Sequence, residues 1–95
     1  MYAPHDTAET RVKEGVAFLD THAPGWRHRI DTDRLQIKNA GACMLGQLCG
    51  TYEKGCAVFG LDRGTDTGRL GFNATGDITF EELDDAWRRA VHRVA

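Results

Sequence analysis

Three cysteines, Cys43, Cys49 and Cys56, carry the most reactive side chains in this sequence. Their spacings of six and seven residues differ from the CxxC pairs that are typical of structural zinc sites. Cys43 is expected in the first turn of a helix, where the helix dipole would lower its pKa and favour the thiolate. A nucleophilic cysteine also needs a base, and no spacing rule connects a histidine to Cys43. The four histidines are His5, His22, His28 and His92. We therefore predict that Cys49 and Cys56 act as small apolar residues, that Cys43 is the exception among the three, and that none is catalytic.

A stretch late in the chain resembles the second half of an EF-hand calcium loop. Gly76 stands where such a loop turns sharply, and Glu82 stands where its bidentate carboxylate ligand is required. The first position holds Gly71 in place of aspartate, and no helix is predicted directly before it. Calcium prefers several anionic oxygens, so we predict no metal ligand and no cofactor. A degenerate, metal-responsive EF-hand that uses Asn73, Asp77 and Glu82 stays as an alternative.

Two short arginine-rich segments could contact phosphates. Acidic residues adjoin both segments, and the whole chain has 12 Lys+Arg against 14 Asp+Glu, a net charge of -2. We therefore expect these segments to be solvated surface, and we regard nucleic-acid binding as the less favoured reading. A nucleic-acid-associated regulator stays as a second alternative, with basic contacts from Arg27, Arg29, Arg88 and Arg89.

Length and composition predict one small domain, residues 1–95, because 95 residues with 41% hydrophobic side chains suffice for a single core. No apolar run approaches the roughly 20 residues that a membrane helix needs, so no membrane partner is expected. The stretch from Met1 to Asp6 leads into a charged segment without the apolar region of a signal peptide. An odd number of cysteines suits a reducing compartment. We predict a cytoplasmic protein.

Two amphipathic helices are predicted near the ends of the chain, over residues 7–22 and about 80–94. Asp6 or Thr7 can cap the first helix, and Thr79 opens a complete capping box for the second. Their apolar faces consist of Val12, Val16 and Leu19 in the first helix, and of Leu83, Trp87, Ala90, Val91 and Val94 in the second.

A third helix is predicted in the middle of the chain, over residues 40–59, with Asn39 as its N-cap. Its apolar stripe has one helical phase and consists of Leu45, Leu48, Cys49, Tyr52, Cys56 and Phe59. Gly55 lies inside this stripe at a cost of about 1 kcal/mol relative to alanine. Gly60 is expected to end the helix in the left-handed conformation, with Leu61 folding back on it.

Two segments lack a clear period. The segment from Trp26 to Lys38 is irregular, and a short strand at residues 34–38 would give at most one β pairing. Residues 62–76 are rich in Gly, Asp and Thr, which indicates a long surface loop and the expected place for a mobile or binding segment. The fold class is therefore mainly α, a single three-helix domain.

Four short sequence elements are similar to those of a known group of proteins. They are GW at Gly25, IDTDRLQI at Ile30, CMLGQLCGTY at Cys43 and GF at Gly71. In this pattern the chain resembles small uncharacterised proteins of actinobacteria and their bacteriophages. The resemblance implies a cytoplasmic protein of actinobacterial or phage origin, and it implies no activity or ligand.

We expect the residues of these elements to hold the fold together. Gln47 is predicted to hydrogen-bond the irregular backbone between Ile30 and Ile37. Ala42, Gly46 and Gly50 form a stripe of small residues, which favours internal helix packing over a partner helix or a symmetric dimer. The structural motif consists of Trp26, Ile30, Leu35, Ile37, Leu45, Gly46, Gln47, Leu48, Gly50, Tyr52, Phe72 and Trp87.

The function expected from these patterns is that of a non-enzymatic accessory protein that binds another protein. It would be a phage-encoded modulator of a host component or a small virion component, with a protein partner or a second copy of itself. A domain of this size leaves little room for a deep substrate pocket, and no acid and base pair converges in the sequence.

Overall fold

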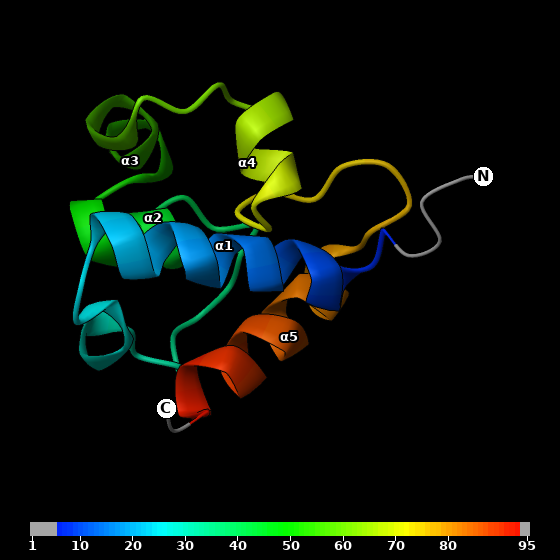
Figure 1. Cartoon of the computed structure of the whole chain (residues 1–95), viewed down its shortest axis with the longest axis horizontal. Coiled ribbons are helices and arrows are strands. Elements are labelled where there is room, and N and C mark those ends of the chain that lie inside the picture. The colour runs from blue at the N-terminus through cyan, green and yellow to red at the C-terminus, as the bar shows by residue number, and fades with distance from the viewer. Residues whose placement is uncertain (1–5, 94–95) are drawn as a thin grey trace.

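The computed structural model describes residues 6–93, and helices and turns make up this part of the chain (Figure 1). No strand occurs in it, so the predicted mainly α class is confirmed and the predicted strand at residues 34–38 is wrong. Gln36 makes a single backbone hydrogen bond to Ala42, too little for a β ladder. In chain order the elements are α1 (Ala8–His22), the 3-10 helix η1 (Trp26–Arg29), α2 (Met44–Cys49), α3 (Tyr52–Phe59), α4 (Thr65–Arg69) and α5 (Phe80–His92).

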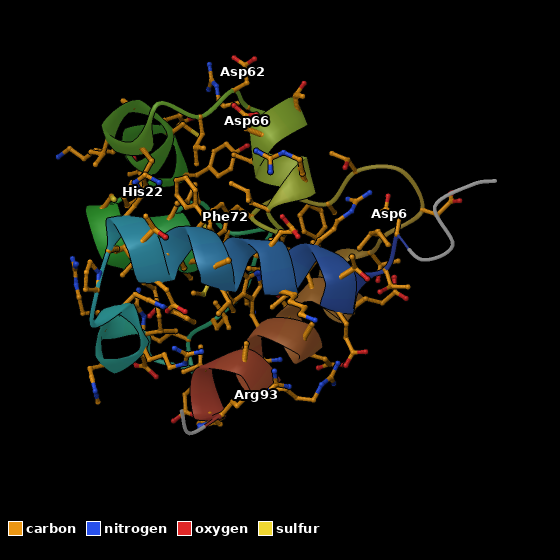
Figure 2. All side chains as sticks on the ribbon, in the orientation of Figure 1. Asp6, His22, Asp62, Asp66, Phe72 and Arg93 are labelled. Atoms are coloured by element: carbon orange, nitrogen blue, oxygen red, sulfur yellow. The ribbon has the colours of Figure 1, made fainter. Side chains whose placement is uncertain are left out.

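The core forms where α1 crosses α5 and the chain around Phe72 (Figure 2). Trp87 lies at its centre: the ring stacks on Phe72 at 5.6 Å and meets Trp26 edge to face at 5.8 Å. The indole nitrogen of Trp87 donates a 2.6 Å hydrogen bond to the carbonyl of Gly71. Gly15 lets α1 approach this close, because a Cβ there would lie 2.7 Å from the Trp87 ring.

The predicted helices at the two ends of the chain are both present. Thr7 is the N-cap of α1 and accepts from the backbone nitrogen of Thr10. The capping box of α5 is complete, with Thr79 accepting from the Glu82 nitrogen and Glu82 accepting from the Thr79 nitrogen. The helix ends at His92, and Val94, predicted on its apolar face, lies outside the described residues.

The single helix predicted over residues 40–59 is wrong, because the chain breaks at Gly50 into α2 and α3. Gly50 has φ 106°, a conformation that only glycine adopts easily, and Thr51 then caps α3 through the nitrogen of Lys54. The two short helices pack on each other at Gly55, where a Cβ would lie 2.6 Å from that of Leu45. Thus the apolar stripe continues across the break because two helices share one core.

The start of this region also differs from its prediction. The N-cap of α2 is Cys43 rather than Asn39, and residues 39–42 form turns. The side chain of Asn39 instead accepts from the nitrogen of Gly41 at 3.0 Å. At the other end, Gly60 is left-handed as predicted, and Leu61 donates to the carbonyl of Cys56 in the fold-back contact.

The expected surface loop of residues 62–76 contains the helix α4 and is largely packed on the core, which corrects the prediction of an irregular surface loop. Thr67 is fully buried and hydrogen-bonds the Tyr52 hydroxyl at 2.8 Å, and Leu70 and Phe72 are core residues. The few apolar side chains of this segment point inward, so its polar composition is misleading.

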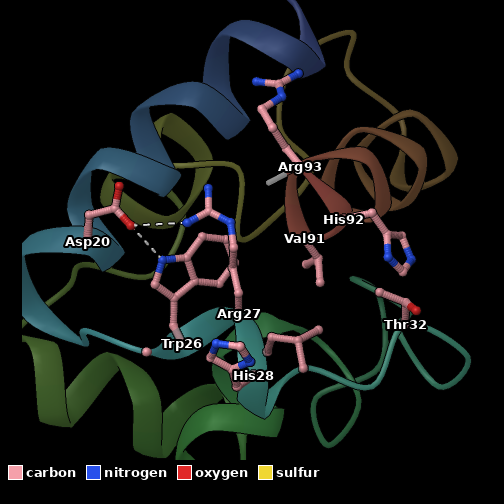
Figure 3. A pocket seen from close by; sticks show the side chains of 10 residues that line it. Asp20, Trp26, Arg27, His28, Thr32, Val91, His92 and Arg93 are labelled. Carbon is pink, nitrogen blue, oxygen red and sulfur yellow. Dashed lines mark hydrogen bonds and ion pairs between the residues drawn. The ribbon is translucent and has the colours of Figure 1, made fainter. Parts of the chain in front are cut away.

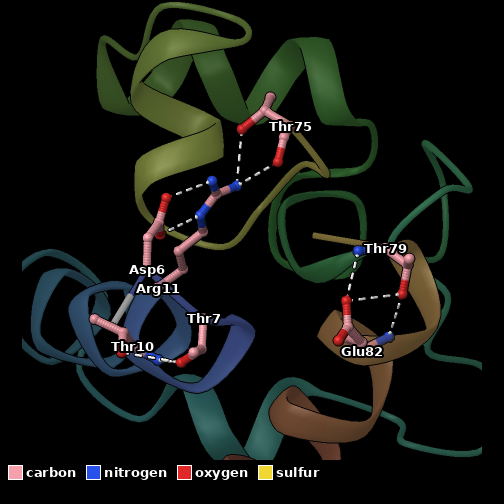
Figure 4. Close-up of polar contacts among 7 residues, drawn as sticks. All are labelled: Asp6, Thr7, Thr10, Arg11, Thr75, Thr79 and Glu82. Carbon is pink, nitrogen blue, oxygen red and sulfur yellow. Dashed lines mark hydrogen bonds and ion pairs between the residues drawn. The ribbon is translucent and has the colours of Figure 1, made fainter. Parts of the chain in front are cut away.

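Arg11 ties the start of α1 to the end of this segment (Figure 4). Its guanidinium donates two 2.9 Å hydrogen bonds to Asp6 and two more to the carbonyl and hydroxyl oxygens of Thr75. These hydrogen bonds to Arg11 lower the pKa of the Asp6 carboxyl below its ordinary value.

In residues 6–93 no helix is long and apolar enough to cross a membrane.

Candidate binding groove between α1 and α5

Most of the twelve motif residues lie in the core, and nine of them are buried. Gln47 and Tyr52 are half-buried, and Gly50 is exposed at the helix break. Gln47 makes the predicted contact with the irregular segment: its side chain accepts from the nitrogen of Asp31 at 2.6 Å and donates to the carbonyl oxygens of Asp31 and Ala42. These residues position elements and leave little surface for recognition.

The stripe of small residues on α2 is filled by the protein itself. A Cβ on Gly46 would lie 2.8 Å from the backbone carbon of Gly41, so the preceding turn covers this position. Gly50 serves the break between helices and carries no packing face. The stripe is therefore an internal contact, made at Gly46 by the turn before α2.

Cys43 lies in a different environment from the one predicted. It is fully buried as the N-cap of α2, and its sulfur accepts from the Gly46 nitrogen at 3.3 Å. Burial raises the pKa of the Cys43 thiol above its ordinary value, although nearby backbone N–H groups oppose the effect. Burial likewise raises the pKa of Cys49 and of Cys56. The expected lowering of the Cys43 pKa is thus wrong.

The half-pattern of a calcium loop does not gather ligands. A short helix, α4, does precede it, contrary to the sequence prediction. Glu82, however, uses its carboxylate in the capping box, and Asn73 donates to the Tyr52 hydroxyl. Within residues 6–93 no group of three or more His, Cys, Asp or Glu side chains could hold a metal ion.

The arginines of the two basic segments are largely bound to backbone carbonyls. Arg29 donates to Leu48 at 2.6 Å, and Arg88 donates to Thr32 and Leu35. These contacts fix η1 and the irregular segment against α2 and α5. Only part of the predicted basic surface is therefore free to bind a partner.

Two adjoining cavities lie along α5, and together we call them the α1/α5 groove. One, of about 570 Å³, lies between η1 and the end of α5 (Figure 3), and the other, of about 280 Å³, lies between α1 and α5. Arg27 and Arg93 line both cavities and so join them. The residues of the second cavity are Glu9, Val12, Lys13, Val16, Arg27, Ala86, Arg89, Ala90 and Arg93.

The second cavity of the groove is built largely from one face of each helix. Four lining residues come from α1, from Glu9 to Val16. Four more come from α5 and its C-cap, from Ala86 to Arg93. Both sets follow the spacing i, i+3, i+4, i+7, which places them along a single helix face. This spacing makes the groove floor aliphatic, with Val12, Ala86 and Ala90 buried, while the charged side chains form its rim.

Arg27 lies at the junction of the two cavities. Its guanidinium stacks 4.5 Å from the centre of the Trp26 ring and donates a 3.2 Å hydrogen bond to the carbonyl of Ala90. Asp20 holds the Trp26 indole nitrogen at 2.8 Å and lies 3.5 Å from Arg27 (Figure 3). This set of contacts anchors η1 to the end of α5 and keeps a cation in the groove.

Sequence reasoning flagged Arg27 and the arginines of α5 but missed Glu9 and Lys13. The signal was present in the spacing of charged residues that flank the apolar stripe of each terminal helix. The sequence does not show that α1 packs against α5, and this packing brings Glu9 within 3.3 Å of Arg89. Comparison with known protein families, curated proteins and solved structures gave no match.

Proposed function

We propose that this chain is a non-enzymatic binding protein that acts through a protein partner docked in the α1/α5 groove. The observation that carries the proposal is the groove itself, with an aliphatic floor and a charged rim formed by two helix faces. Protein interfaces combine an apolar centre with a polar rim in the same way. The predicted motif residues support the proposal indirectly, since they fix the helices that form the groove.

The proposed partner class follows from the resemblance of the four sequence elements to small actinobacterial and phage proteins. We propose a cytoplasmic protein that modulates a host component as a phage-encoded factor or that forms part of a virion. The groove fits either role, because both require a stable surface for one protein and no chemistry on a small substrate.

A tagged pull-down from nuclease-treated actinobacterial lysate tests the function. The expected result is one protein recovered at a stoichiometric ratio, identified by mass spectrometry. Light scattering of the purified bait is the companion measurement. A bait that stays a monomer and recovers nothing contradicts the proposal, and a discrete bait oligomer replaces the foreign partner with a second copy of this chain.

A further inference from the structure

We infer that the α1/α5 groove takes an acidic, amphipathic segment of the partner protein; this inference rests on the proposed function. Apolar side chains of that segment would contact the groove floor, and its carboxylates would pair with the basic rim. The argument has three steps, which concern charge, shape and the class of anion.

The charge of the groove is opposite to that of the whole protein. Four cationic side chains line it, and two carboxylates accompany them, whereas the chain as a whole has a net charge of -2. The cations are Lys13, Arg27, Arg89 and Arg93, and the carboxylates are Glu9 and Asp20. A segregated positive patch steers and orients an acidic partner.

The cations differ in how firmly internal contacts hold them. Arg89 pairs with Glu9 at 3.3 Å in a solvent-exposed contact, which contributes little stability and exchanges readily. Lys13 and Arg93 are exposed, and within residues 6–93 their side chains make no hydrogen bond or ion pair. Arg93 also lines both cavities, at the end of α5 (Figure 2). Lys13 and Arg93 are therefore the two cations most open to a partner carboxylate.

The shape of the groove suits a short helix. In the second cavity the lining on each helix extends from position i to i+7, about 10 Å along the axis at 1.5 Å per residue. The half-exposed side chains beside this floor give such a helix an apolar contact, as in other complexes in which an amphipathic helix lies in a groove. Val16 and Val91 are half-buried at the floor and would lose their remaining exposure on binding.

The same features favour a peptide over a nucleic acid. A nucleic-acid surface presents phosphates along its length and gains little from an aliphatic floor. Glu9 and Asp20 would repel phosphates, whereas a peptide can offer a basic or neutral residue opposite each of them. Arg29 and Arg88 also donate hydrogen bonds to backbone carbonyls, which leaves them less available to phosphates.

Nuclear magnetic resonance titration of the full chain tests the inference. The probe is a synthetic helix of about 14 residues, four turns, with leucines at i, i+3, i+4 and i+7 and glutamates between them. The matched probe has lysine in place of every glutamate. We expect the acidic peptide to shift the amide signals near Val12, Val16 and Ala90. It should bind at least tenfold more tightly than the basic peptide, and its affinity should fall as the salt concentration rises.

Two variants locate the contact. The double variant Lys13→Glu with Arg93→Glu should lose at least tenfold in affinity for the acidic peptide. The control, Lys38→Glu with Lys54→Glu, makes the same charge change outside the groove and should alter affinity less than twofold. Circular dichroism verifies that both variants fold. Equal binding of the two peptides, shifts outside the groove, or no binding of the acidic peptide would overturn the inference, as would a DNA duplex that occupies the groove in preference to it.

The same double variant separates this inference from the proposed function. If it still recovers the stoichiometric partner from lysate, the protein binds its partner by another surface, so the function stands and the inference fails. If the native chain recovers no partner and does not self-associate, the proposed function fails irrespective of the peptide result.

Discussion

At the scale of single residues, polar side chains in this protein are used mainly to join segments that are distant in sequence. Gln47 connects α2 to Asp31, and Arg11 connects α1 to Thr75. The buried side-chain nitrogen and oxygen atoms of residues 6–93 all have hydrogen-bond partners. This complete pairing agrees with the general rule that an unpaired buried polar group costs about 1–3 kcal/mol.

The buried Cys43 thiol is expected to make the folded protein less stable at alkaline pH. Its pKa in the folded protein is raised above the ordinary value of 9.0. Its contribution is therefore fully present below that value and is lost as pH rises through the folded pKa. Cys43→Ser keeps an N-cap that does not ionise. Urea unfolding measures the free energy of unfolding at pH 7 and at pH 10. Between these two pH values we expect the native chain to lose more stability than the variant does. Equal losses would contradict the role of the Cys43 thiol in this pH dependence.

Among the helices, the ends are set by local sequence, whereas the break between α2 and α3 is set by tertiary packing. The capping box of α5 satisfies its own backbone donors within one turn. The break between α2 and α3 instead lets Leu45 meet Gly55, and the backbone nitrogen of Tyr52 donates to the carbonyl of Ala40. One continuous helix would separate these contacts.

Gly50→Ala tests that break. An alanine at φ 106° is strained, so we expect a loss of about 1–3 kcal/mol in the free energy of unfolding. Gly41→Ala is the control, because its Cβ would meet only the Asn39 side chain at 3.7 Å, and it should change stability by less than about 0.5 kcal/mol. Urea denaturation measures both variants. A Gly50→Ala protein as stable as the control would argue for one continuous helix.

At the scale of the whole molecule, α1, the chain around Phe72 and α5 share one core. Trp87 of α5 contacts α1 at Gly15 and contacts the other segment through the Phe72 ring and the Gly71 carbonyl. The α1/α5 groove lies on the outer side of the same helix pair. Stability of the core and geometry of the groove are therefore coupled.

Trp87→Phe should destabilise the whole domain. The change removes the hydrogen bond to the Gly71 carbonyl and leaves a cavity, for which we expect a loss of about 2–4 kcal/mol. Val58→Ala is the control, because Val58 is 64% exposed and its truncation should cost less than about 0.5 kcal/mol. Thermal unfolding should stay a single transition at a lower midpoint. A loss below about 1 kcal/mol would place the centre of the core elsewhere.

Features that depend on neighbours within one or two helical turns can be predicted from the amino-acid sequence. These are the amphipathic faces of α1 and α5, the capping box at Thr79 and the left-handed end at Gly60, because their hydrogen bonds and side-chain spacing are local. The break at Gly50, the helix α4 and the burial of Cys43 arise from packing between segments and could not be predicted from local sequence. Each depends on desolvation or contact by residues distant in sequence, as does the groove, whose two helix faces become one surface only when α1 packs on α5.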